Sequence, residues 1–428
     1  MKKILSLILT LTLILSATAA LADLTVVNGT DNRNITINKA GLNPSADEMI
    51  ANNISPTTGR ELDRIEIPDG AGGAAFTGLY TPVMVQVSNA GGGVVENTKG
   101  EPSTAPIGLE YADVVYEALQ ARSSKGGSLT RFSAVFSDVF PAYVGFVRST
   151  RLTHVRLRQE WNSAFCTSGY AATYVKPEFK KFGVKNHEGA TASDPGLVYV
   201  GDDGDGKPWK KYVWRLAPAG DANSELYELN KIMSYVYPKY YEMDPNSDEY
   251  KKNAPYNHTF KFTDETPAGD TALHIEVKFG GGFKTDSILE YDDSTNTYFR
   301  YVPASDGSYF QFRAQNLINP HEGIHNKKKM IIADGKEFGE QITFTNVIVQ
   351  AITMKWKGNE QPDPILTGTG NADYFMGGKH FSGVWERETI NDRTVFYGED
   401  GNEISLLRGK TLIILMDYTG TGSSISYD

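Results

Sequence analysis

Short apolar runs that end in turn residues dominate the first half of the chain. Residues 81–88 are rich in valine and predict a buried strand. Residues 114–119 and 129–136 predict two further strands, and the Ser- and Gly-rich residues 123–127 between them predict a hairpin turn. These strands are the expected framework of an N-terminal domain.

Two other segments space their apolar residues as a helix does. Residues 150–161 follow a short strand expected at 143–147, and residues 223–236 predict a second helix. From this mixture of strands and helices we expect an α/β fold (α+β mixed), with an N-terminal α/β domain over residues 81–258.

The pattern changes at about residue 259, beyond which strands alternate with tight-turn signals such as Asp-Gly pairs. This pattern predicts a smaller β-rich domain over residues 259–417, which ends in a strand at 411–416. A polar tail is expected over residues 418–428.

The N-terminus has the three parts of a secretory signal peptide: two lysines, an apolar run too short to cross a bilayer, and an Ala-Leu-Ala end. We expect residues 1–22 to be removed, so that the mature protein works outside the cytoplasm, secreted or associated with the cell wall. An uncut membrane anchor is the alternative. Residues 23–80 are rich in Asn, Thr, Gly and Asp and predict a loosely ordered lead-in.

Composition and charge narrow the possible partners. A chain of 428 residues with 40% hydrophobic and 11% aromatic residues has the content of folded domains. Its net charge of −10, from 42 basic and 52 acidic residues, argues against nucleic acid as a partner. The single cysteine, Cys166, rules out an internal disulfide and lies far from the cleavage point, where a lipid anchor would need it. We therefore expect no stable membrane anchor.

Three arginines are candidates for an anion-binding site. Arg131 lies on a predicted strand, and Arg148 and Arg151 stand where a short strand turns into the first predicted helix. Ser149 could cap that helix, which would leave free backbone N–H groups beside the arginines. Because a guanidinium binds a carboxylate or a phosphate through two parallel hydrogen bonds, an anionic ligand suits this group.

Two carboxylates offer a different chemistry. Asp113 and Glu117 are four residues apart and share a face of either a strand or a helix. As an acid and a base they could hydrolyse a glycosidic bond. Alternatively, Arg131 and Arg148 form purely structural ion pairs with these two carboxylates. The sequence leaves both alternatives open.

The segment from His321 to His325 matches the His-Glu-x-x-His pattern of zinc proteases, which requires a helix. Pro320 before the segment and Gly323 within it are loop signals. We therefore expect a surface hairpin here, and we expect no metal site and no cofactor in the protein.

A series of short motifs resembles the YerB-like family. The motifs extend from about residue 55 to about residue 416 in the family's order, so the resemblance covers most of the mature chain. They include Ser55-Pro56-Thr57-Thr58-Gly59, Ala112-Asp113-Val114-Val115-Tyr116-Glu117, Gly127-Ser128-Leu129-Thr130-Arg131-Phe132, Gly145-Phe146-Val147-Arg148-Ser149-Thr150-Arg151 and Leu407-Arg408-Gly409-Lys410-Thr411. The resemblance implies a bacterial exported protein, often lipid-anchored, with an α/β N-terminal domain, a smaller C-terminal domain and no established activity. This chain lacks the lipobox cysteine of its relatives.

The residues and the resemblance together lead to one hypothesis with two alternatives. We expect an exported cell-envelope protein that binds an anionic envelope component, such as a cell-wall glycan or peptide, or an envelope protein, through the three arginines and Ser149. One alternative is a hydrolase of cell-wall material that uses the two carboxylates. The other is a scaffold that docks partner proteins through the β-rich domain. The sequence does not decide whether the protein turns over any substrate.

Overall fold

The computed structural model describes residues 24–31, 33–40, 45–73, 75–78, 80–89, 105–122, 128–161, 163–170, 172–182, 197–199, 211–218, 224–236, 259–280, 286–303, 308–358, 361–419 and 422–428. The expected signal peptide and the turn expected at residues 123–127 lie outside these ranges.

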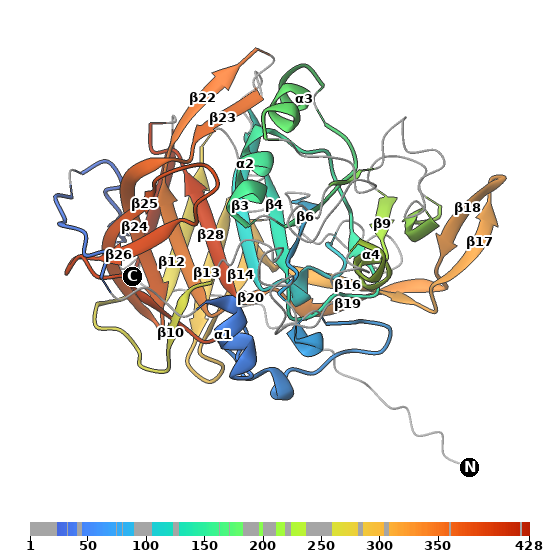
Figure 1. Cartoon of the computed structure of the whole chain (residues 1–428), viewed down its shortest axis with the longest axis horizontal. Helices are drawn as coiled ribbons and strands as arrows, with labels where there is room; N and C mark the ends of the chain where they lie inside the picture. The colour runs from blue at the N-terminus through green and yellow to red at the C-terminus, as the bar shows by residue number, and fades with distance from the viewer. Residues whose placement is uncertain are drawn as a thin grey trace.

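A large mixed sheet runs through the middle of the molecule (Figure 1). Its eleven strands within the described residues are, in spatial order, β11 (Asp270–Thr271), β25 (Lys379–Arg387), β24 (Gly368–Met376), β21 (Asn346–Ala351), β28 (Thr411–Met416), β3 (Val114–Arg122), β4 (Ser128–Phe136), β2 (Val83–Ser88), β6 (Ala164–Thr167) and β7 (Leu197–Tyr199), with β26 (Val395–Gly398) paired to β25. The three strands predicted in the first half are β2, β3 and β4, and β3 pairs with β4 in the antiparallel manner of the predicted hairpin.

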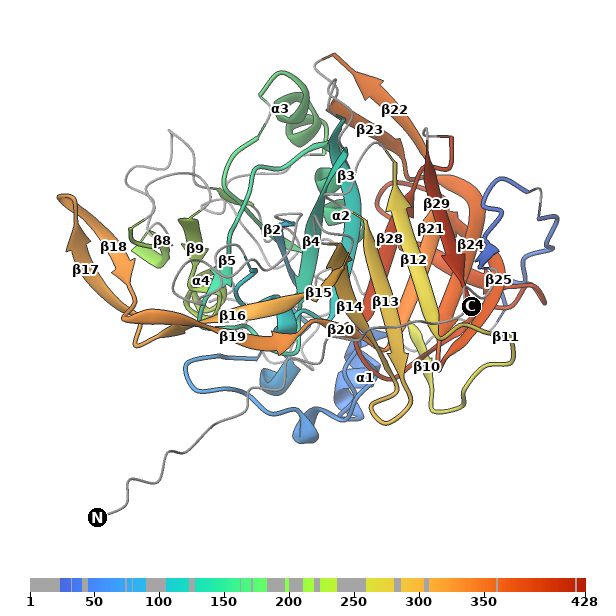
Figure 2. The same ribbon diagram turned by 180° about the vertical axis from the view of Figure 1, so that it is seen from behind.

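A second sheet packs on one face of the large sheet, as Figure 2 shows for β12, β13 and β14. Its seven described strands are β1 (Thr25–Val26), β29 (Ser423–Tyr427), β12 (His274–Phe279), β13 (Ser287–Asp292), β14 (Thr297–Pro303), β15 (Tyr309–Gln311) and β20 (Thr343–Phe344). The layers meet through aromatic side chains, since the rings of Phe132 on β4 and Phe312 lie 5.9 Å apart. Part of the core therefore lies between the two sheets, and the same cluster continues on the other face of the large sheet, where it includes Val155, Leu157 and Trp161 of α2.

The four described α-helices are α1 (Ala46–Ala51), α2 (Leu152–Trp161), α3 (Ala172–Lys181) and α4 (Leu229–Val236). Helix α2 is the predicted helix at residues 150–161, and Trp161 on it donates a hydrogen bond to the Tyr116 hydroxyl on β3 at 3.0 Å. The second predicted helix is shorter than expected, because the strand β9 (Glu225–Tyr227) occupies its beginning and α4 starts only at Leu229.

The expected α/β fold is wrong, because the protein is β-rich in both halves. Strand β28 from the C-terminal end lies between β21 and β3, in parallel with both, so that Thr411 is opposite Val114. Parallel strands inside a sheet are buried on both faces and read as continuous apolar runs, as the strands of α/β proteins do. The covering layer that an α/β fold takes from helices comes here largely from the second sheet.

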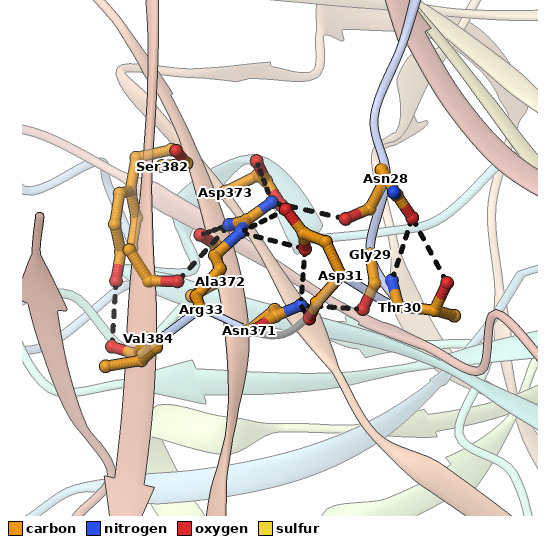
Figure 3. Close-up of polar contacts among 12 residues, drawn as sticks. Asn28, Gly29, Thr30, Asp31, Arg33, Asn371, Ala372, Asp373, Ser382 and Val384 are labelled. Atoms are coloured by element: carbon orange, nitrogen blue, oxygen red, sulfur yellow. Dashed lines mark hydrogen bonds and ion pairs between the residues drawn. The ribbon is translucent and has the colours of Figure 1, made fainter. Parts of the chain in front are cut away.

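The N-terminal lead-in is tied to the C-terminal half of the chain (Figure 3). The Arg33 guanidinium donates to the Ala372 carbonyl at 2.7 Å and pairs with the Asp373 carboxylate at 3.1 Å. The Asn371 amide donates to the Asp31 carbonyl at 2.6 Å. In the segment expected as a polar tail, β29 lies between β1 and β12. The described parts of both termini thus belong to the folded body.

Shorter strand pairs complete the structure. A long β-arm extends from the body (Figure 1) and consists of β16 (Arg313–Ile318) with β19 (Gly335–Gln341), continued by β17 (His321–His325) with β18 (Lys328–Ile332). Strand β9 pairs with β5 (Val144–Gly145) on one side and with β8 (Val213–Arg215) on the other. Two further pairs are β10 (Lys261–Thr263) with β27 (Ser405–Leu407) and β22 (Thr353–Lys357) with β23 (Gln361–Ile365).

Candidate functional site

Arg131 and Glu117 lie on opposite faces of the large sheet. In the pairing of β3 with β4, Arg131 is opposite Ala118, and Glu117 is opposite Phe132. Residues directly opposite each other share a face, and successive residues alternate between faces. Arg131 therefore points to the face that α2 covers, whereas Glu117 points to the second sheet. A structural ion pair between these two residues does not form.

The turn between β5 and α2 brings the other predicted residues to Arg131. The backbone of Arg148 is held by β2, because its N–H donates to the Gln86 carbonyl at 2.8 Å. The Arg131 guanidinium donates to the Ser149 carbonyl, and Arg151 immediately precedes α2. The structure thus brings Arg131, Arg148, Ser149 and Arg151 together, and we call these four residues the arginine cluster.

His154 belongs to the same site, although the sequence analysis did not single it out. Its Nδ1 accepts a hydrogen bond from the Arg151 backbone N–H at 3.0 Å. A side chain at the third helical position that accepts from the N-cap amide repeats half of a capping box, a role usually taken by Glu or Gln. Because α2 begins at Leu152, its N-cap position falls on Arg151 and not on Ser149, and the capping contact that the structure shows comes from His154. In the sequence, the signal that could have indicated His154 is its position three residues after Arg151, which is the spacing of a capping box.

Burial and the neighbouring positive charges lower the pKa values of three side chains in and beside the cluster. The pKa of Arg131 is lowered well below its ordinary value, by burial first and then by the charges of Arg151 and Arg148. Burial and the Arg148 charge also lower the pKa of Arg151. For His154, burial and then the Arg131 and Arg151 charges lower the pKa well below its ordinary value, so the ring is neutral. A negative group placed here would relieve all three unfavourable interactions.

Carboxylates are scarce around these cations. The Arg131 and Arg151 guanidinium groups donate to backbone carbonyls, of Ser149 and Thr150 respectively, and neither forms an ion pair with any residue that the structure describes. Arg148 differs, because its charge acts on the Glu225 carboxyl of β9. The end of the cluster nearest α2 therefore carries positive charge without a counterion from the described part of the chain.

Glu117 belongs to a buried ion pair on the other face of the sheet. Its carboxylate lies 3.1 Å from Nη2 of Arg300 on β14 and accepts from Thr130 Oγ1 at 2.8 Å. The Arg300 guanidinium also lies against two aromatic rings, with centroid distances of 4.9 Å to Phe132 and 4.7 Å to Phe312. This pair joins the two sheets, which is a structural role.

Asp113 lies in a separate buried group with Asp138. Its Oδ2 accepts from Thr57 Oγ1 at 3.0 Å and from the Ser137 and Asp138 amides at 2.7 and 3.0 Å. Thr57 Oγ1 also lies 3.2 Å from Asp138 Oδ1. Asp113 and Glu117 thus have different partners and are sealed from solvent, so the arrangement offers no acid and base pair to a substrate.

Asp113→Asn is expected to reduce the pH dependence of stability. Burial raises the pKa of Asp138, and burial together with the Asp138 charge raises that of Asp113. A carboxyl with a raised folded-state pKa stabilises the fold below its unfolded pKa, about 3.9, and loses this contribution as the pH rises through the folded pKa. Asparagine has no such proton to lose. In urea titrations from about pH 4 to about pH 9, the free energy of unfolding should fall less steeply in the variant; equal slopes would contradict the assignment.

The predicted surface hairpin at His321 is confirmed. His321 and His325 lie at the two ends of β17, which pairs with β18 in the β-arm. Four residues of strand separate the two imidazoles by roughly 13 Å, too far for one metal ion. No group of three or more potential metal ligands occurs among the described residues. Cys166 is a free, buried core residue.

Comparison with known proteins agrees with the motif order found in the sequence. Residues 76–227 match the family profile "Protein of unknown function (DUF3048) N-terminal domain", and residues 275–413 match the corresponding C-terminal domain. The chain is 26% identical over 342 residues to "Putative lipoprotein YerB" of Bacillus subtilis (strain 168), covering 79% of this chain and 85% of that protein. The crystal structure of the YerB protein from Bacillus subtilis superposes with a TM-score of 0.54 at 19% identity, over 87% of this chain and 99% of that one.

The chain therefore belongs to the YerB-like family of proteins with paired DUF3048 domains. The two matched segments are joined by the large sheet, in which β28 pairs directly with β3. The domain boundary expected between residues 258 and 259 stays a prediction. Of the helices in the described ranges, none has the length and apolar content that a bilayer span requires.

Proposed function

We propose that the protein is an exported cell-envelope protein that binds an anionic envelope component, such as a cell-wall glycan or peptide, or an envelope protein, at the arginine cluster. The observation that carries this proposal is the pair Arg131 and Arg151. Both guanidinium groups are largely removed from water, and their hydrogen bonds go to backbone carbonyls instead of carboxylates.

Removing a guanidinium from water without a counterion is unfavourable, and neighbouring like charges add to the cost. Proteins keep such unfavourable groups where a ligand compensates them, so a concentration of buried cations with perturbed pKa values is a candidate binding site. An anionic group that reaches Arg131 and Arg151 would supply the missing counterion.

The envelope location rests on two observations. The first 22 residues have the organisation of a secretory signal peptide. A relative carries the name of a lipoprotein, which is a protein held at a membrane surface. The only cysteine of this chain is buried in the large sheet, so we propose a secreted or wall-associated protein instead of a lipid-anchored one.

A sedimentation experiment tests the proposal. The purified protein should pellet with isolated cell-wall sacculi, and Arg148→Ala/Arg151→Ala should reduce the pelleted fraction at least roughly fivefold, since each charged hydrogen bond is worth about 1.5–3 kcal/mol. Arg64→Ala/Lys176→Ala removes the same charge from exposed positions and should pellet as the wild type does. Unchanged pelleting of the folded cluster variant would remove the site assignment.

The same experiment separates the alternatives. Release of soluble wall fragments would favour the hydrolase. The structure does not support that hypothesis, because Asp113 and Glu117 are buried in separate groups. Pelleting that survives loss of both arginines would favour the scaffold, with its partner bound elsewhere on the protein.

A further inference from the structure

The hydrogen bond to Arg151 determines where the proton of His154 lies. Nδ1 accepts from the Arg151 N–H at 3.0 Å, and an accepting ring nitrogen carries no hydrogen. Because burial and the neighbouring arginines keep the ring neutral, its single proton is on Nε2. The ring is fully buried, and Nε2 has no hydrogen-bond partner among the residues that the structure describes. His154 thus holds an unused N–H donor beside the arginines.

Other donors at this end of the cluster are also unused. Nε of Arg151 is buried and has no hydrogen-bond partner in the described ranges of the chain. The amides in the first turn of α2 have no carbonyl partner within the helix, as at any helix start. Of the described carboxylates, Glu225 is the one on which the charge of the cluster acts; it lies toward Arg148 and pairs with Arg215 at 3.0 Å. Among the described residues, the free side-chain groups that Arg131, Arg151 and His154 offer at this end are therefore donors, and the acceptors beside them are the backbone carbonyls of Ser149 and Thr150.

We infer that this end of the site takes a tetrahedral phosphoryl oxyanion whose free oxygens carry no proton, in preference to a carboxylate, and that His154 Nε2–H is a specificity-determining donor. The inference rests on the proposed function and names the ligand class of the same site. A carboxylate brings one charge and two oxygens, whereas a phosphate dianion brings up to two charges and more acceptor oxygens for the same donors. A protonated phosphate oxygen would place a donor against these side-chain donors, with no carboxylate of a described residue at this end to receive it.

Calorimetric titration of the purified protein with sulfate, glycerol phosphate and acetate tests the ligand class. Sulfate, which stays unprotonated, should bind at about pH 5 and about pH 8 equally well within roughly threefold, and acetate at least about tenfold more weakly. A phosphate monoester loses its second proton near pH 6, so its affinity relative to sulfate should rise about tenfold between these pH values. The ratio to sulfate removes any effect of protein titration, including that of Glu225.

Each other outcome overturns a defined part of the inference. Acetate binding as tightly as sulfate would overturn the preference for a tetrahedral anion and leave the proposed function intact. A constant ratio of phosphate to sulfate affinity would overturn the arrangement of side-chain donors at this end. Failure of all three anions to bind would overturn both the inference and the arginine cluster as an anion site.

Two variants separate the donor of His154 from its capping role. His154→Asn can keep an acceptor near the Nδ1 position but loses the Nε2 donor, and it should weaken sulfate binding about tenfold or more. His154→Gln can restore a donor near the Nε2 position and should bind sulfate within roughly threefold of the wild type. Equal losses in the two variants, with both folded by circular dichroism, would overturn the role of His154 as a donor.

Discussion

Glu117→Ala is expected to lower the free energy of unfolding by about 3–5 kcal/mol, because it leaves the Arg300 guanidinium buried without its carboxylate. The Glu117 and Arg300 side chains are 0% and 1% exposed, with 3.1 Å between Oε2 and Nη2. Their pair connects the two sheets within the part of the core that lies between them. Urea denaturation followed by tryptophan fluorescence measures the change.

The control for this loss is an exposed pair in the same chain. Arg64 and Glu61 lie 2.7 Å apart with side chains 77% and 47% exposed, so Glu61→Ala should cost no more than about 0.5 kcal/mol. The double variant Glu117→Leu/Arg300→Met should recover most of the stability, since apolar side chains can replace a buried pair. A loss below about 1 kcal/mol for Glu117→Ala would contradict the interpretation.

Arg131→Met is expected to have the opposite effect and to raise the free energy of unfolding of the ligand-free protein by about 1–4 kcal/mol. Arg131 is 4% exposed, lies near two other arginines and forms no ion pair with a described residue. Methionine fills a similar volume without a charge. The same variant should lose anion binding, so stability and binding change in opposite directions.

Arg156 provides the matched control for Arg131. It is also largely buried, but its guanidinium pairs with Glu178 at 2.9 Å and Asp363 at 2.7 Å. Arg156→Met should therefore lower the free energy of unfolding by about 1–3 kcal/mol and leave sulfate binding unchanged. If Arg131→Met lowers stability as Arg156→Met does, then the hydrogen bond to the Ser149 carbonyl is structural and the case for a ligand site weakens.

Sequence reasoning succeeded where the signal was local. The valine-rich run of β2, the hairpin of β3 and β4, the helix α2 and the hairpin at His321 each depend on residues close together in the chain. Residue alternation and helical periodicity are set by the backbone within a few positions, so such elements can be predicted without knowledge of their partners. The order of short motifs was likewise enough to identify the family.

The prediction of the fold class was wrong because the fold class depends on pairing between strands that are distant in sequence. The residues of β28 and β3 are separated by almost 300 positions, yet they pair in parallel within one sheet. Nothing in either apolar run states whether a helix or a second sheet covers it, since burial requires apolar residues in both cases. The predicted α/β class rested on the apolar composition of the strands, which does not show that a second sheet covers them.

The candidate site shows the same division. Local sequence was enough to place Arg148, Ser149 and Arg151 at one strand-to-helix junction and to suggest an anionic ligand. Only the tertiary structure decided that Arg131 faces this junction while Glu117 faces away from it, and that His154 joins the arginines. The physical reason is that the residue type alone determines the charge that a side chain can carry. Its counterion and its exposure to water depend on segments that come together only in the folded chain.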